Sequence, residues 1–509
     1  MSHSIRPTRQ ASAAYIALLC ALLAGCNVGP KYHPPAIKAP PAFKEPPAQF
    51  KEVDGWNVAQ PQDAALRGKW WEIYNEPDLN ALEEQLNIDN QNIRQAFENF
   101  MEARALVREA RSQYFPTVTV GGSYTRSQAS SNTKSASSTS TGTPSGAQTQ
   151  LFSLPADISW EPDLWGKVRN AVHASQYQAQ LSAADLENER LTEQASLAEF
   201  FFEIRGQDAL QKLLNETVEA DRKALQIARA RYDTGVDDQI SVVEAQTTLD
   251  SAQSAAINLG IARAQYEHAI ATLIGKPASA FSIPVEAKTS APPPIPIGLP
   301  SQLLERRPDI AAAERNMASA NAQIRVAYAA YYPVLTLSAS GGLESSALKN
   351  LMSASSRFWS VGTSISETVY DGGLRRATVN QHIATYNANV AAYRQSVLTA
   401  FQQVEDSLAA VRILSQQILR QQEAVDSSQT FLKLELGRYE TGIDPYIDVV
   451  TAQITLLTNQ QSRTNLQVQQ MTASVQLIEA LGGGWDKSQL PTSTQVTEKP
   501  SKSDTTIQH

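Results

Sequence analysis

The stretch RYDTGVDDQISVVEAQTTL, residues 231–249, returns later in the chain as RYETGIDPYIDVVTAQITL, residues 438–456. Aligned without a gap, 12 of the 19 positions are identical, at an offset of 207 residues. Such self-similarity is typical of one supersecondary unit that a fold uses twice. In each copy a Thr-Gly pair separates two helical patterns, and a glycine just past a helix end takes the left-handed conformation. Each copy is therefore predicted to be the tip of a helical hairpin, although one copy alone would indicate only an ordinary αα-hairpin.

The first 25 residues are predicted to be a signal peptide rather than part of the fold. Arg6 and Arg9 precede an apolar run, residues 13–23, that is too short to span a membrane as a helix. The run ends in Leu-Ala-Gly before Cys26, which resembles a bacterial lipoprotein signal. The resemblance implies that Cys26 becomes the lipid-carrying first residue of the mature chain. The alternative is a plain secretory signal with an incidental cysteine.

Composition excludes several classes of function. The chain carries 43 basic and 51 acidic residues, and removal of residues 1–25 leaves a net charge near −10 with no basic patch, which argues against nucleic-acid binding. Cys26 is then the only cysteine, so neither a disulfide framework nor a cysteine-based metal site is possible. The six histidines are scattered, and no H-E-x-x-H, phosphate-binding glycine loop or G-x-S-x-G motif is present. We expect no enzyme, no metal and no cofactor beyond the covalent lipid.

In the first half of the chain the spacing of apolar residues predicts a definite sequence of helices and strands. Residues 26–69 are rich in proline and are predicted to form an extended strap next to the lipid anchor. Residues 70–274 form the first structural repeat, which begins with a helix. The spacing of apolar residues then changes from helical to alternating, which predicts two strands, 115–126 and 151–161, separated by a polar loop. It returns to helical spacing in a long helix, 165–232, which is followed by the tip and a return helix. A helix of that length extends on the order of 100 Å.

The second half repeats this plan. A proline-rich connector, residues 275–305, leads into the second structural repeat, residues 306–485. The repeat again predicts a helix, two alternating strands, a long helix, a tip and a return helix, with the strands at 333–343 and 357–369 and the long helix at 373–439. The polar residues 486–509 are predicted to be a disordered tail.

The four predicted strands have the length and the alternation of membrane-barrel strands. Four strands cannot close a barrel, and open edges are not tolerated in lipid, so closure requires several chains. Two chains would supply 8 strands and a filled lumen, whereas three would supply 12 and a pore, which a transport function favours. The competing hypothesis is a lipid-anchored periplasmic coiled-coil adaptor or structural protein, which leaves the strands unexplained.

Four further motifs, together with the doubled tip, make the chain similar to the outer-membrane factors, the TolC-like channel family, in the lipoprotein branch of NodT and OprM type. The four are CNVGPKY at 26–32, WW at 70–71 before PD at 77–78, RRPDI at 306–310 and YDGGLR at 370–375, and the doubled tip has RY-x-TG in each copy. The resemblance implies an α+β membrane protein: a homotrimeric, 12-stranded transmembrane β-barrel with four strands per chain, continued by a long α-helical coiled-coil barrel.

The same resemblance implies a function in the outer membrane. Its members act as passive exit ducts for drugs or toxic small molecules, and they dock a periplasmic adaptor (membrane fusion) protein and an inner-membrane efflux pump, which for this branch implies the resistance-nodulation-division type. A protein-secretion duct is the alternative within the channel class.

Three acids are the candidates for a periplasmic gate. By resemblance, Asp448 matches the gate aspartate of the family, and Asp444 lies four residues earlier, so both can face the same side of the return helix. In the first copy Glu244 occupies the position equivalent to Thr451, where the family often has a further acid, and whether Glu244 faces the lumen stays open. The alternative for all three is that they are solvated acids at a helix start.

Six residues are candidates for locking the tip or docking an adaptor: Arg231, Tyr232, Gly235, Arg438, Tyr439 and Gly442. The two glycines are required by the turns in any case. The arginines and tyrosines also have a simpler interpretation, in which arginine compensates the helix dipole and tyrosine packs.

Overall fold

The computed structural model describes residues 28–34, 40, 43–44, 68–128, 130, 148–295 and 303–499. The predicted signal peptide, Cys26 and most of the strap therefore lie outside the described residues. The chain divides into two compact units. The strand unit comprises residues 1–34, 103–179 and 316–389, and the helical unit comprises residues 35–102, 180–315 and 390–509.

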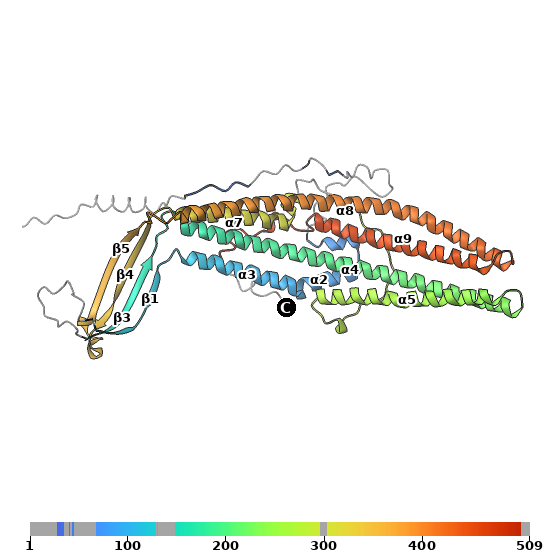
Figure 1. The fold of residues 1–509 in the computed structure, drawn as a ribbon, viewed down its shortest axis with the longest axis horizontal. Helices are drawn as coiled ribbons and strands as arrows, with labels where there is room; N and C mark the ends of the chain where they lie inside the picture. The colour runs from blue at the N-terminus through green and yellow to red at the C-terminus, as the bar shows by residue number, and fades with distance from the viewer. Residues whose placement is uncertain are drawn as a thin grey trace, which may run out of the picture. The chain divides into compact units, whose positions relative to one another are not determined.

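The strand unit contains one antiparallel sheet built from both repeats (Figure 1). The strands are β1 (Thr117–Val120), β2 (Ser123–Gln128), β3 (Gln148–Trp160), β4 (Val334–Ser345) and β5 (Arg357–Ser366). Their order is β1-β3-β4-β5, and β2 also pairs with β3, beyond the end of β1. The repeats meet where β3 pairs with β4, with Ala156 opposite Gly341. The sheet therefore has four strand positions and two open edges.

The strand expected at 115–126 is interrupted, because β1 and β2 are separate. The register does not slip across the gap: Val120 lies opposite Ala156, and Ser123 lies opposite Ser153. In between, the Gly121 N–H donates to the Pro155 carbonyl over 3.0 Å, but proline has no N–H to donate in return. One missing ladder bond divides the strand without exchanging its two faces.

The apolar face of the outer strands is exposed in the single chain. Val120 and Trp359 are each 81% exposed, and Val361 and Ile365 are each 73% exposed. Large apolar side chains exposed together on a sheet face are typical of contact with a partner or a membrane.

Aromatic side chains join the two repeats at one end of the sheet. The indole N–H of Trp165, just before the first long helix, donates to the carbonyl of Pro333, just before β4, over 2.7 Å. The Trp165 ring also stacks on Tyr332 at 4.9 Å between centroids. The indole N–H of Trp160 donates to the Tyr114 carbonyl over 3.0 Å. These contacts fix the points where strands become helices.

Helices make up the rest of both repeats (Figure 1). They are α2 (Pro77–Asp89), α3 (Gln91–Ser112), α4 (Lys167–Asp233), α5 (Gln239–Leu273), α6 (Leu303–Arg306), α7 (Pro308–Ala329), α8 (Leu374–Glu440) and α9 (Tyr446–Ala480), with short 3₁₀ turns at Trp70–Tyr74, Ala278–Ala280, Leu348–Asn350, Ala354–Ser356 and Lys487–Gln489. Within the helical unit, α4 turns back into α5 and α8 turns back into α9. Among the described residues, no helix has both the length and the apolar character needed to cross a membrane.

The first helical pattern forms two helices, divided at Asn90. The Asn90 side-chain oxygen accepts hydrogen bonds from the backbone N–H groups of Asn92 and Ile93, at 2.8 and 2.9 Å, as a helix cap does. Its amide donates to Glu193 and to the Leu273 carbonyl. The break thus ties α3 to α4 and α5.

The core of the helical unit lies around Trp70 and Phe201, which are 1% and 0% exposed. Phe43, from the predicted strap, is buried in the same cluster. The chain after Trp485 packs elsewhere on the helical unit: Val496 is 0% exposed, Leu490 packs against a cluster with Ala184 and Trp485, and Gln180 donates to the Pro491 carbonyl over 2.9 Å. Residues 486–499 therefore differ from the disordered tail expected for 486–509, because buried apolar contacts hold them, while 500–509 lie outside the described residues.

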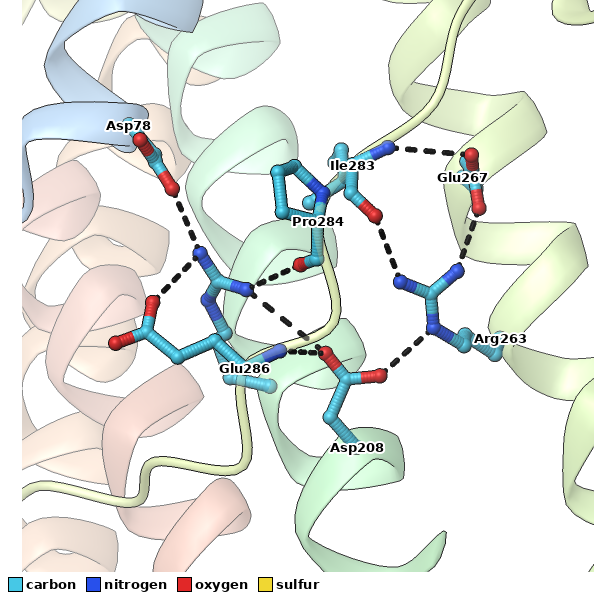
Figure 2. Close-up of polar contacts among 8 residues, drawn as sticks. Asp78, Asp208, Arg263, Glu267, Ile283, Pro284 and Glu286 are labelled. Atoms are coloured by element: carbon cyan, nitrogen blue, oxygen red, sulfur yellow. Dashed lines mark hydrogen bonds and ion pairs between the residues drawn. The ribbon is translucent and has the colours of Figure 1, made fainter.

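An ion network fastens the connector after α5 to the helices (Figure 2). Asp208 on α4 is 1% exposed. It accepts from Arg263 Nε on α5 over 2.7 Å and from the Glu286 backbone N–H over 2.9 Å. Arg205 lies 3.8 Å from Asp208, donates to Asp78 over 2.9 Å and donates to the Pro284 carbonyl over 2.9 Å. One buried carboxylate thus lies between two guanidinium groups.

Glu83 on α2 has no such compensation. It is 0% exposed, and neither carboxylate oxygen has a hydrogen-bond partner among the described residues. Burial, assisted by repulsion from Glu84, raises the pKa of Glu83 well above its usual value. The group is therefore protonated in the fold over a range where it ionises in the unfolded chain, so its cost to stability increases as the pH rises above the usual carboxyl pKa.

We expect Glu83→Leu to stabilise the helical unit by about 1 to 3 kcal/mol, because leucine removes two unpaired buried oxygens from a face that already carries Leu79 and Leu86. The measurement is thermal unfolding followed by helical circular dichroism at pH 8. Glu84→Gln is the control, since that side chain is 49% exposed. An unfolding midpoint for Glu83→Leu that lies below wild type would contradict this expectation.

Candidate gate at the helical tips

Both tips close their long helix in the same way. The glycines that follow have positive φ, 74° at Gly235 and 76° at Gly442. The N–H of Val236 donates to the Arg231 carbonyl, and that of Ile443 donates to the Arg438 carbonyl, each over 2.9 Å. This is a Schellman cap, in which the residue after the helix must adopt the left-handed conformation.

The two acids of the first tip have separate tasks. Asp238 caps α5, since its carboxylate accepts from the backbone N–H groups of Ile240 and Ser241. Asp237 instead accepts from the Ser241 hydroxyl over 2.9 Å and from the Tyr439 hydroxyl of the other hairpin over 2.8 Å. A dipole-compensating acid at a helix start accounts for Asp238 but not for Asp237.

Arg231, Asp237 and Tyr439 join the two hairpins, and we call this group the tip bridge. The Arg231 guanidinium lies 4.6 Å from the centre of the Tyr439 ring and 3.5 Å from the Asp237 carboxylate. It also donates to the Glu440 carbonyl over 3.2 Å. Tyr439 is 3% exposed and packs edge-on against Tyr446. The bridge is therefore a charged, largely water-excluded contact between α4 and α8.

The tip bridge shifts the protonation of its members. Burial alone would raise the pKa of Asp237, but hydrogen bonds from Tyr439, Ser241 and the Asp238 backbone, with the nearby Arg231 charge, outweigh burial and lower it. Burial and the Asp237 carboxylate raise the pKa of Tyr439 above that of a free phenol. The pair is thus held as carboxylate and neutral phenol at neutral pH.

The ion pair of the second tip lies within one hairpin. Arg438 makes a two-point contact with Asp444, which lowers the pKa of Asp444. Carboxylate oxygens of Glu435, Asp444 and Asp448 lie within 4.8 Å of one another. Burial and repulsion from Asp444 raise the pKa of Glu435. Asp444 and Asp448 lie close together, as their spacing predicts, and the Arg438 guanidinium faces Asp444.

Equivalent residues of the two tips have different surroundings. Tyr232 is 46% exposed, whereas its counterpart Tyr439 is buried. Glu244 is partly exposed and lines a cavity between α5 and α9. Arg231 and Tyr439 were predicted from the sequence, but their partner Asp237 was not. The available signal was that Asp237 and Asp444 are the same residue at the same position of the two copies.

Comparison with known proteins agrees with this architecture. The family model described as outer membrane efflux protein matches residues 82–276 and 299–483, one segment in each repeat. The solvent efflux pump outer membrane protein SrpC of Pseudomonas putida is 31% identical over 484 residues, which cover 92% of this chain and 97% of SrpC. The antibiotic efflux pump outer membrane protein ArpC of Pseudomonas putida is 29% identical over 472 residues, which cover 92% and 95%.

The solved structure of the outer-membrane channel OprN has the same fold, with a TM-score of 0.79 and 27% identity over 90% of this chain and 100% of that one. The predicted TolC-like fold, the two repeats and the outer-membrane location are confirmed. Since the matched proteins are channels, the expectation that the chain is not an enzyme is confirmed as well. The chain belongs to the outer membrane efflux protein family and is one of its channel proteins.

Proposed function

We propose that three copies of this chain form the outer-membrane exit duct of a tripartite efflux system, closed at rest by the tip bridge. The observation that carries the proposal is the bond from Tyr439 to Asp237, which joins the two hairpins at the doubled turn. The similarity to solvent and antibiotic efflux proteins supports small toxic molecules as the cargo.

The trimer is supported by the open edges of the sheet. One edge is formed by β1 and β2 and the other by β5, so both have unpaired backbone groups in the single chain. Four strand positions per chain give a closed 12-stranded barrel when three chains pair edge to edge. We further propose that Cys26 carries the lipid that anchors the strap to the outer membrane.

A periplasmic adaptor is the partner that we propose for the tips, with an inner-membrane pump of the resistance-nodulation-division type behind it. The exposed Tyr232 beside the Gly235 turn is the side chain we assign to docking. The partly exposed Arg231 and the buried Tyr439 form the bridge and are assigned to locking. Asp448, near Asp444, and Glu244 are proposed to line the gate.

The turn at Gly442 provides a test of adaptor engagement. A Cβ there would meet only Arg231 Nη2, at 4.0 Å, so space is available, but φ is 76°. We expect Gly442→Val to abolish efflux, because a β-branched residue cannot hold that conformation, and Gly442→Asn to retain it. The measurement is drug susceptibility at matched amounts of assembled channel.

Gly437→Val is the matched control, since that glycine lies within α8 on the same hairpin and a Cβ there meets nothing within 4 Å. Normal efflux by Gly442→Val at normal channel levels would refute the assigned role.

The cargo is tested in a strain that lacks the gene. Susceptibility to toluene-like solvents and to antibiotics is expected to rise and to be restored by the wild-type gene. Unchanged susceptibility together with loss of a secreted protein would favour a protein-secretion duct instead.

A further inference from the structure

A cavity of about 430 Å³ lies between α5 and α9, a few turns from the tips. It is walled mainly by aliphatic and threonine side chains, and α4 forms its floor with Thr217 and Asp221. The cavity belongs wholly to the helical unit, and the tip bridge does not line it. Its volume suits a small organic molecule with an apolar body.

The floor of this cavity carries an unpartnered acid. Asp221 is 2% exposed, and its Oδ2 is buried without a hydrogen-bond partner among the described residues. Burial raises the pKa of Asp221 to about 6, so the group is still mostly ionised at neutral pH. A buried carboxylate oxygen without a donor is costly, and a native structure that keeps one requires an explanation.

Two further acceptors line the same cavity. The Gln453 side-chain oxygen on α9 is also buried without a partner among the described residues, and Glu244 supplies a second carboxylate from α5. None of the lining side chains is basic. The cavity therefore has apolar walls, unpaired acceptors and no basic side chain to balance the acids. These features fit a ligand with a hydrophobic body and a cationic group that donates hydrogen bonds.

We propose that this cavity binds a small amphipathic organic cation, a protonated amine whose ammonium group donates to Asp221 and whose apolar part lies between α5 and α9. Each protomer would carry one such site. It is independent of the tip bridge and of the proposed docking of an adaptor.

The test uses the full chain, assembled and reconstituted in lipid nanodiscs, with a fluorescent primary amine, dansylcadaverine, as the probe. Its matched control is the same dansyl amide with a pentyl chain in place of the aminopentyl chain. Saturable binding of the amine, at least tenfold tighter than binding of the pentyl analogue, is expected. Equal binding of the two, or none, would overturn the proposal.

Variants then locate the site. Asp221→Asn keeps the shape and removes the charge, and we expect it to weaken amine binding tenfold or more. Glu216→Gln removes an exposed acid from the same helix outside the cavity and should change nothing. Ala255→Leu fills the cavity from its exposed rim without altering Asp221, so it should weaken both ligands.

The outcomes discriminate between occupants. If Asp221→Asn does not assemble, Ala255→Leu still decides: undiminished amine binding by that variant places the probe elsewhere and overturns the proposal. Absence of binding by the assembled wild type, the result expected if a neighbouring copy of the chain fills the cavity, also overturns it.

Discussion

The double variant Arg231→Ala, Tyr439→Phe is expected to open the channel at rest. Tyrosine to phenylalanine removes the donor to Asp237 and retains the packing of the ring against Tyr446, while alanine removes the guanidinium above that ring. A hydrogen bond to a charged group contributes about 1.5 to 3 kcal/mol, so loss of the bridge in one chain should raise the ratio of open to closed tips by at least about tenfold. Single-channel conductance in planar bilayers is the measurement.

Tyr232→Phe is the control for that experiment. It is the same substitution at the equivalent position of the first copy, where the side chain is 46% exposed and has no cross-hairpin bond among the described residues. Its conductance should equal that of wild type. If Tyr232→Phe opened the channel as much as the double variant, the assignment of locking to one tyrosine would be wrong.

The bridge also has a defined pH dependence. Because the pKa of Asp237 in the fold is below the usual 3.8, its stabilisation is complete above that value and is lost as the pH falls through the lowered one. Asp237 should therefore stay ionised from pH 7 to pH 5 and cause no change in conductance over that range. Its protonation should raise the conductance only in stronger acid. The Tyr439→Phe variant should lose part of that acid response.

Asp208→Asn is expected to be the most destabilising single substitution in the helical unit. It removes the one carboxylate between Arg263 and Arg205, which are 19% and 5% exposed, and leaves two guanidinium groups without their shared partner. Breaking a buried ion pair from one side costs about 3 to 5 kcal/mol. Thermal unfolding of the purified protein measures the loss.

Glu267→Gln is the matched control for the network. Glu267 also contacts Arg263, at 2.7 Å, but its loss leaves Arg263 bonded to Asp208 and to the Ile283 carbonyl. We expect a midpoint between wild type and Asp208→Asn. Equal midpoints for the two variants would indicate that Asp208 has no special position in the network.

The periodic features were predictable from the sequence, and the asymmetric ones were not. The doubled tip, the long helices and the alternating strands each repeat a local pattern that directly reflects backbone geometry. The division at Gly121 was missed because the N–H that is lacking belongs to Pro155, on the partner strand. The capping role of Asn90 depends likewise on groups distant in sequence, Glu193 and Leu273.

The tip bridge illustrates the same limit. The two copies have arginine, tyrosine and aspartate at equivalent positions, so the sequence offers two equal candidate bridges. Packing selects one: Tyr439 is directed into the cluster with Tyr446, whereas Tyr232 is exposed. The residue of the first copy that is equivalent to Tyr446 is a glutamine, Gln239. That single difference supplies a ring for Tyr439 to pack against and none for Tyr232.

Native mass spectrometry of the detergent-extracted protein tests most directly whether this chain forms the proposed duct. The account predicts one species with the mass of three mature chains, each starting at Cys26 and carrying covalent lipid. The boiled sample should give a single lipidated chain. A monomer or dimer that leaves the membrane without detergent would contradict the duct and favour a lipid-anchored coiled-coil protein.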